Sequence, residues 1–158
     1  MSDLVLLLKL VHVLGAAVLF GTGAGIAFFM LMAHRTRDAA TIAATARVVV
    51  IADAIFTAGA VILQPISGTA LAWTIGYPLS ASWIVASLAL YVLVGLCWLP
   101  VVWIQIQLRD LARASAGQGK PLPPRYFSLF RVWFWLGWPA FLGMVAIFAL
   151  MLWKPALW

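Results

Sequence analysis

The stretch from Leu4 to His34 limits the possible folds more than any other part of this sequence, because it is almost entirely apolar. At ~1.5 Å rise per residue, a helix over this stretch is longer than the ~30 Å hydrocarbon core of a bilayer. Three polar features interrupt it: Lys9 and His12 near its start, the glycine-rich patch 21–25, and His34 at its end. Charged and imidazole groups are costly in lipid, so we expect them to face protein, a cofactor or water.

The composition indicates that the whole chain is a membrane domain. Hydrophobic residues make up 66% of the 158 positions and charged residues 9%, whereas a soluble domain has roughly 25% charged residues. The net charge of +6 does not indicate a nucleic-acid partner, because most basic residues flank two of the three polar breaks. These residues are Arg35, Arg37, Arg47, Arg109, Arg113, Lys120, Arg125 and Arg131. Loops rich in Lys and Arg are typically cytoplasmic, so we expect both termini on the outer, periplasmic side.

The apolar runs predict an all-α, four-helix transmembrane bundle that forms a single integral membrane domain over residues 1–158. The predicted transmembrane helices cover about 4–33, 44–66, 82–107 and 128–153. Asp38 is expected to cap the second helix, which begins near Ala39, and Pro65 is expected to kink it. The Gly- and Pro-rich segment 114–125 is predicted to be the one long loop.

His12 and His34 are predicted to lie on one face of the first helix, since 22 residues are close to six turns. They are ~33 Å apart along the axis, at opposite membrane surfaces, so they cannot bind one iron together. Small residues lie between them, among them Gly15, Ala16 and Gly23. One interpretation is a seam for close helix packing. The other is the floor of a groove for haem or another planar ligand, with His12 as axial ligand and His34 as a second site.

Two polar residues of the second helix share a depth with His12. Gln64 and Ser67 are therefore candidate partners that fix the tautomer of the His12 ring. Lys9 lies near the start of the first helix, where a lysine can extend its amine to the membrane surface. The residues that contact His12 and Lys9 determine whether this face of the first helix is structural or functional.

Asp53 is the only acidic residue within a predicted transmembrane segment. We expect it either to form an ion pair with Arg47 or another arginine at that depth, or to handle protons. Desolvation would raise the pKa of such a carboxyl and a neighbouring arginine would lower it.

Several stretches carry a family resemblance: Leu10–Ala16 with Leu19–Gly23, Tyr77–Ser80, Cys97–Trp103, Leu122–Tyr126 and Gly137–Ala140. Together they resemble a bacterial family of predicted integral membrane proteins, domain-of-unknown-function family 2269. The resemblance covers nearly the whole chain and implies a multi-pass protein of the bacterial inner membrane.

The positions of His12 and His34 are similar to those in the first helix of HemJ-type protoporphyrinogen oxidases, a family that in general appearance resembles the copper-resistance D-like membrane proteins. This resemblance implies haem b as cofactor. The HemJ-type proteins also use a lysine shortly after a tryptophan in a later helix, and the comparable stretch 83–88 has no lysine. The resemblance therefore extends to a haem-binding bundle rather than to the oxidase reaction.

The leading hypothesis is a haem-binding or redox-associated inner-membrane protein. The second is an accessory or structural subunit without a cofactor, whose glycine-rich face packs on a partner helix or on a second copy of the chain. The third is a small proton-coupled transporter that uses Asp53 and Lys9. Whether the protein is an enzyme stays open.

Overall fold

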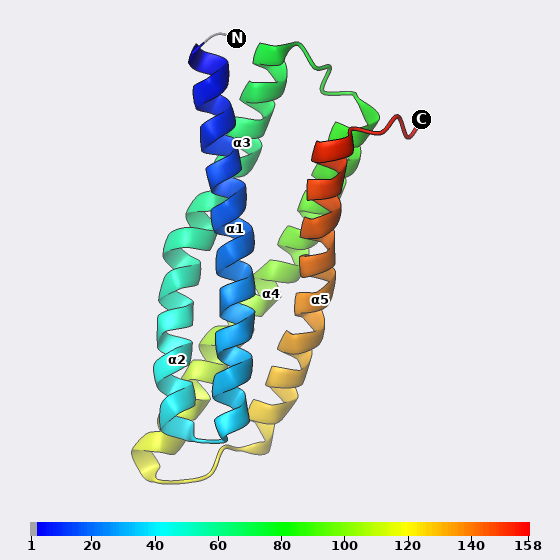
Figure 1. Cartoon of the computed structure of the whole chain (residues 1–158). Helices are drawn as coiled ribbons and strands as arrows, with labels where there is room; N and C mark the ends of the chain where they lie inside the picture. Colours follow the sequence, from blue (N-terminus) through cyan, green and yellow to red (C-terminus); the bar gives the residue numbers. More distant parts are fainter. Residues whose placement is uncertain (1–2) are drawn as a thin grey trace.

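The structure is a computed structural model that describes residues 3–158, and all of the regular elements in this range are helices. They are α1 (Asp3–Thr36), α2 (Ala39–Ala52), η1 (Asp53–Thr57), α3 (Ala58–Ile75), α4 (Ser82–Gln118) and α5 (Pro124–Trp153). Because α2, η1 and α3 follow one another without a break, the chain forms four long rods (Figure 1). Each rod is long and apolar enough to cross a membrane. The predicted all-α, four-helix transmembrane bundle is confirmed.

The second rod begins where the sequence predicts. The side chain of Asp38 accepts a hydrogen bond from the Thr41 backbone N–H at 2.7 Å, which caps α2 at Ala39. The irregular part of this rod is η1, a turn of π-helix at Asp53–Thr57. Pro65, the expected site of a kink, lies inside α3.

Helix α3 accommodates Pro65 because a side chain from another helix replaces the missing hydrogen bond. Proline has no N–H, so the carbonyl of Val61, four residues earlier, loses its helical partner. The hydroxyl of Tyr91 on α4 donates to this carbonyl at 2.5 Å. Buried backbone groups in a membrane need such replacements, and this one fixes α4 against α3 at mid-height.

The predicted loop 114–125 is much shorter in the structure. Helix α4 continues to Gln118 and ends where Gly119 adopts a left-handed conformation with φ 60°. Helix α5 begins at Pro124, which suits the first turn of a helix because no N–H is needed there. Only residues 119–123 connect the two helices.

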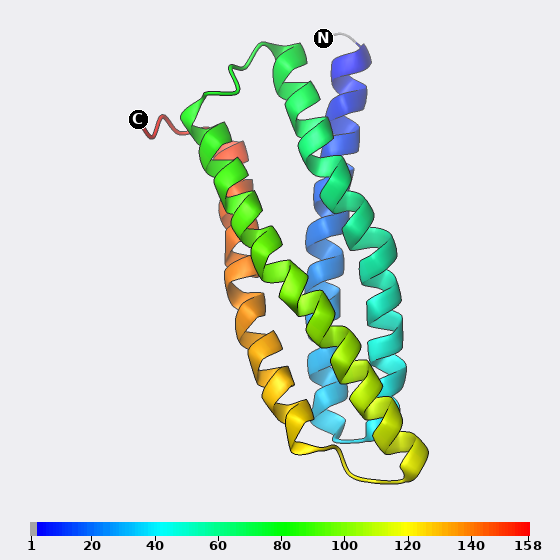
Figure 2. The same ribbon diagram turned by 180° about the vertical axis from the view of Figure 1, so that it is seen from behind.

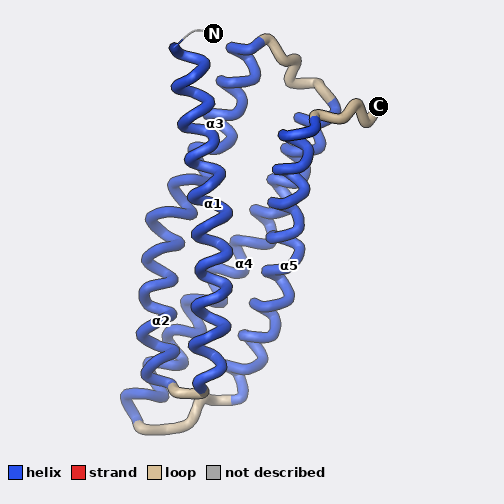
Figure 3. Tube along the Cα trace, viewed as in Figure 1, coloured by secondary structure: helices blue, strands red, loops and turns tan. Residues whose placement is uncertain are grey.

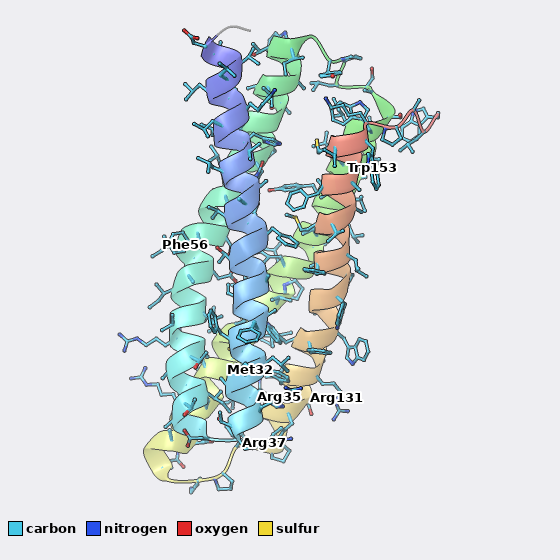
Figure 4. The ribbon with its side chains drawn as sticks, viewed as in Figure 1. Met32, Arg35, Arg37, Phe56, Arg131 and Trp153 are labelled. Atoms are coloured by element: carbon cyan, nitrogen blue, oxygen red, sulfur yellow. The ribbon has the colours of Figure 1, made fainter. Side chains whose placement is uncertain are left out.

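Both ends of the described chain lie at the same end of the bundle, together with the linker 76–81 (Figures 1 and 2). We call this the outer end, following the predicted orientation. The short connections 37–38 and 119–123 lie at the opposite, inner end, as Figure 3 shows in tan. Arg35, Arg37 and Arg131 gather towards the inner end (Figure 4).

The rods pack closely at the inner end and diverge towards the outer end (Figures 1 and 2). Helix α4 packs along α5 and against α2, while α1 packs against α2 and α3. Close contacts between α3 and the α4–α5 pair are scarce. The main buried cluster is correspondingly an inner-half cluster, made of Ile26, Met30, Ala33, Ile42, Ala46, Val49, Ile104, Leu108, Ala112, Tyr126, Phe130 and Trp133.

Candidate functional site

The divergence of the helices leaves a cleft in the outer half of the bundle, which we call the outer cleft. Its volume is about 620 Å³, within the range of about 300–1,000 Å³ typical of ligand sites. The walls are mostly apolar and come from α1, α3, α4 and α5. The polar side chains on these walls are Lys9, His12, Gln64, Thr69, Tyr77, Ser87, Tyr91 and Lys154. The predicted candidates His12, Gln64 and Lys9 thus meet at one site.

The hydrogen bonds around His12 suit one of the two tautomers of its ring. His12 Nδ1 lies 3.0 Å from Ser67 Oγ, and Ser67 Oγ donates its proton to the Leu63 carbonyl at 2.8 Å. Because a hydroxyl has only one proton, a Ser67 that donates to Leu63 accepts from His12, and this pairing suits the tautomer with the ring proton on Nδ1. Nε2 is then unprotonated, and its lone pair has no hydrogen-bond partner among residues 3–158. This arrangement leaves Nε2 free to bind a ligand or a metal.

Gln64 anchors the same region from α3. Its Nε2 donates to the His12 carbonyl at 3.0 Å, so it holds the backbone of α1 rather than the imidazole. Its Oε1 is buried and has no partner within the described chain. Gln64 and Ser67 thus both contact His12, Gln64 at the backbone carbonyl and Ser67 at the ring.

The small residues of the site permit close helix contacts. A β-carbon on Gly68 would lie 2.9 Å from His12 Cε1, and one on Gly15 would lie 3.1 Å from Gln64 Nε2. Gly15 is therefore a packing residue between α1 and α3, whereas Ala16 lines the outer cleft. Gly23 lines a different cavity, nearer the middle of the bundle.

This second space, which we call the central cavity, has a volume of about 400 Å³. It adjoins the outer cleft, because Leu19, Tyr91 and Met144 line both. Asp53 and Thr57 of η1 face it from one side, and Trp98 of α4 from another. The two spaces together run from the outer half of the bundle to the π-helical turn.

Asp53 lies in a buried network of uncharged donors. Trp98 Nε1 donates to Asp53 Oδ1 at 3.2 Å. With its amide nitrogen towards Asp53, Gln105 donates to Oδ2 at 3.0 Å and accepts from Trp133 Nε1 at 3.2 Å.

The expected ion pair between Asp53 and an arginine is not formed among residues 3–158, where the sole ion pair joins Arg109 and Asp110. Arg47 is exposed, because it lies on the side of α2 that faces away from the core.

Gln105 is the functional candidate that the sequence interpretation missed. It lies in the inner half of α4, where its side chain is 1% exposed. Trp98 and Gln105 are seven residues apart, two helical turns, and therefore share a face of α4. This seven-residue spacing is the sequence signal that could have identified the network.

His34 is separate from both spaces. Its Nδ1 lies 3.3 Å from the Tyr126 hydroxyl, and its ring stacks on Phe130 with centroids 3.6 Å apart. It is thus packed against α5 at the inner end, and neither cavity includes it. The structure brings His12 together with Gln64 and Ser67 but packs the partly buried His34 against Tyr126 and Phe130 of α5.

Two lysines flank the outer cleft from opposite sides. Lys9 of α1 is exposed. Lys154, directly after α5, lies 3.1 Å from the Tyr77 hydroxyl and above the Tyr77 and Trp83 rings. Their amines give the outer end of the cleft a positive charge.

The residues of the outer cleft fit a haem b group. His12 offers a free Nε2, and Met144 and Met151 lie on α5 in the same lining. Thioether sulfur and imidazole are both established axial ligands of haem iron. Lys9 and Lys154 are available for the two carboxylates. Within the described residues there is no cluster of His, Cys, Asp or Glu for a separate metal ion.

Comparison with known families classifies the chain. Residues 6–155 match the family described as "Predicted integral membrane protein (DUF2269)". The chain belongs to this family. The predicted family is therefore confirmed, and this DUF2269 protein is an integral membrane protein with four candidate spans. No curated protein and no solved structure matches the chain. The similarity to the HemJ-type proteins stays a prediction.

Proposed function

We propose that this DUF2269 protein binds haem b in its outer cleft, with His12 Nε2 as an axial ligand, and acts as a redox-associated protein of a bacterial inner membrane. The observation that carries the proposal is His12 on the wall of a mostly apolar cleft of about 620 Å³, with its Nδ1 held by Ser67 Oγ. Haem iron supplies one-electron chemistry when it is bound.

The protein's own residues would bind and orient the group. Ser67 keeps the Nδ1 proton in place, which supports metal binding through Nε2 as in other histidine ligands. Gly68 lets α3 approach the flat face of the imidazole. The apolar walls from α4 and α5 exclude water, and Lys9 and Lys154 offer charge for carboxylates at the outer end.

The test is a visible spectrum of the protein purified in mild detergent from haem-replete cells, with and without dithionite. We expect a Soret band that is lost in His12→Ala and retained in the matched variant His34→Ala. Gly68→Ala should shift or weaken the band, because the new β-carbon displaces the His12 ring. A colourless wild-type preparation, or an unchanged band in His12→Ala, would overturn the proposal.

A colourless preparation would favour the accessory-subunit alternative, for which one observation speaks. Gly21 is exposed on α1, and a β-carbon there would meet no atom within 4 Å. Unlike Gly15, it is free for close contact with a helix of another protein or of a second copy. Crosslinking between cysteines placed at position 21 of two copies would test this contact.

A further inference from the structure

The central cavity has an aromatic wall around one acidic side chain. Six of its aromatic residues come from α1, α4 and α5, namely Phe20, Trp98, Trp133, Phe134, Trp138 and Phe141. Its hydrogen-bonding side chains include Asp53, Thr57 and Gln105. No residue of its lining, within the described chain, is Lys, Arg or His. The cavity therefore combines a carboxyl group with aromatic faces and has no internal cation.

The hydrogen bonds of Asp53 suit the ionised carboxylate. The side chain is 3% exposed, and both oxygens accept, from Trp98 Nε1 at 3.2 Å and from Gln105 Nε2 at 3.0 Å. Trp133 in turn donates to Gln105, which orients the Gln105 amide towards Asp53. A buried anion held only by neutral donors is costly within a membrane unless a positive charge accompanies it.

Helix η1 also contributes a polar side chain that has no hydrogen-bond partner within the described chain. Thr57 is 3% exposed, lines the central cavity, and has an Oγ1 with no hydrogen-bond partner among residues 3–158. The wider π turn is closed by the bond from the Ala58 N–H to the Asp53 carbonyl. Such π turns frequently occur at functional sites, and this one directs Asp53 and Thr57 into the same space.

We propose that the central cavity binds a lipophilic organic monocation, with Asp53 as its counter-ion. Aromatic faces attract cations through their negative π surfaces, most strongly where water is excluded. The cavity volume of about 400 Å³ fits a bulky ammonium or phosphonium ion rather than a bare metal ion. Ca²⁺ and Mg²⁺ need several oxygen ligands. Asp53 and Thr57 supply too few oxygen atoms for either metal ion.

The experiment is a titration of the purified full chain with tetraphenylphosphonium, followed by quenching of tryptophan fluorescence. Trp98 and Trp133 line the cavity and report occupancy. We expect saturable binding whose Kd rises at least about ten-fold in Asp53→Asn, because the isosteric amide removes the charge. Triphenylphosphine oxide, a neutral probe of similar shape, should bind more weakly and equally to both proteins.

A second variant keeps the test decisive if Asp53→Asn fails to fold. Gly95 lines the central cavity and has space at its β-carbon, so Gly95→Leu should fill the cavity and weaken tetraphenylphosphonium binding. Gly59→Leu is the matched control, because Gly59 is exposed, lines neither cavity and also has space. Equal binding of the cation by wild type and Asp53→Asn, or by Gly95→Leu and Gly59→Leu, would contradict the proposal. Asp53→Asn should leave the Soret band of the outer cleft in place, so this proposal and the haem proposal fail separately.

Discussion

The same four rods pack closely in the inner half of the bundle and leave open space in the outer half. The inner half is filled by side chains, and Met30, Ile42, Leu108 and Tyr126 there are fully buried. The outer half leaves about 620 Å³ between the α1–α3 pair and the α4–α5 pair. A membrane offers no hydrophobic force to close such a gap, because lipid tails are as apolar as leucine. Helices therefore come together only where side chains interlock.

The polar groups follow the same division. The outer half contains His12 with a free Nε2, and the middle contains Asp53 without a cation. At the inner half, His34 is matched by Tyr126 and Phe130. Buried polar groups with complete partners hold a structure together, while incomplete ones need an explanation, which a bound ligand can supply. The predictions below separate these two roles, in decreasing order of expected effect.

The largest effect is expected from removing the same side chain in the two halves. Met30→Ala should lower the free energy of unfolding by about 3 kcal/mol, because it leaves a cavity in close packing. Met144→Ala is the matched variant, since Met144 is half-buried and faces existing space. Met144→Ala should lower the free energy of unfolding much less than Met30→Ala. Denaturation in mixed micelles, followed by the helical circular dichroism signal, measures both. Equal losses would show that the outer half is packed as tightly as the inner half.

The two histidines should respond in opposite ways. His34→Ala should destabilise the protein by about 2 kcal/mol, since it removes the stack on Phe130 and leaves the buried Tyr126 hydroxyl unpaired. His12→Ala should change stability less but abolish the proposed haem spectrum. The same denaturation assay and visible spectrum distinguish them. If both variants lost stability to the same extent and neither changed the spectrum, both histidines would be structural.

The junction between the halves can be probed through Pro65. Tyr91→Phe should lower the free energy of unfolding by about 1 kcal/mol, because the Val61 carbonyl loses the hydroxyl that donates to it. In a Pro65→Ala background the restored backbone N–H can serve that carbonyl, so the same Tyr91→Phe change should cost close to nothing. A double-mutant cycle of unfolding free energies measures the coupling. Additive effects would mean that the Tyr91 hydroxyl does not compensate for the proline.

Periodicity and composition were enough to predict the rods and the meeting of His12 with residues of α3. The apolar runs mark the segments that can cross a membrane, and the Asp38 cap marks the start of the second rod. Depth matching placed Gln64 and Ser67 beside His12, because residues at one height in antiparallel helices are neighbours. These features depend on residues that are close together in the sequence, so the sequence alone is enough to predict them.

The central network was less predictable, because it depends on which helix faces which. Arginine near Asp53 in depth suggested an ion pair, but Arg47 lies on the opposite side of α2 from the core. The uncharged donors Trp98 and Gln105 take its place. The length of α4 beyond the membrane was also missed, since Gly117 does not end the helix and Gly119 does. Helix rotation and the exact capping residue are set by tertiary contacts rather than by local pattern.

The smallest expected effect concerns the turn that joins α1 to α2 at the inner end. The Thr41 side chain and backbone N–H hydrogen-bond to the Asp38 carboxylate and lower the pKa of Asp38 from its usual value of 3.8. A carboxyl whose pKa is lowered by folding stabilises the native state at neutral pH. That contribution is lost as the pH falls below 3.8 towards the folded pKa.

Asp38→Asn isolates this effect, because asparagine also caps helices but does not titrate in this range. The wild-type midpoint of thermal unfolding should fall slightly more than that of Asp38→Asn between pH 6 and pH 3, a window chosen to bracket the usual value of 3.8. The difference should be small, since Asp38 is fully exposed and solvent screens its interactions. Parallel curves would assign the acid sensitivity of the bundle to other groups. A larger separation would instead show that the stability of the packed inner half depends on this one turn.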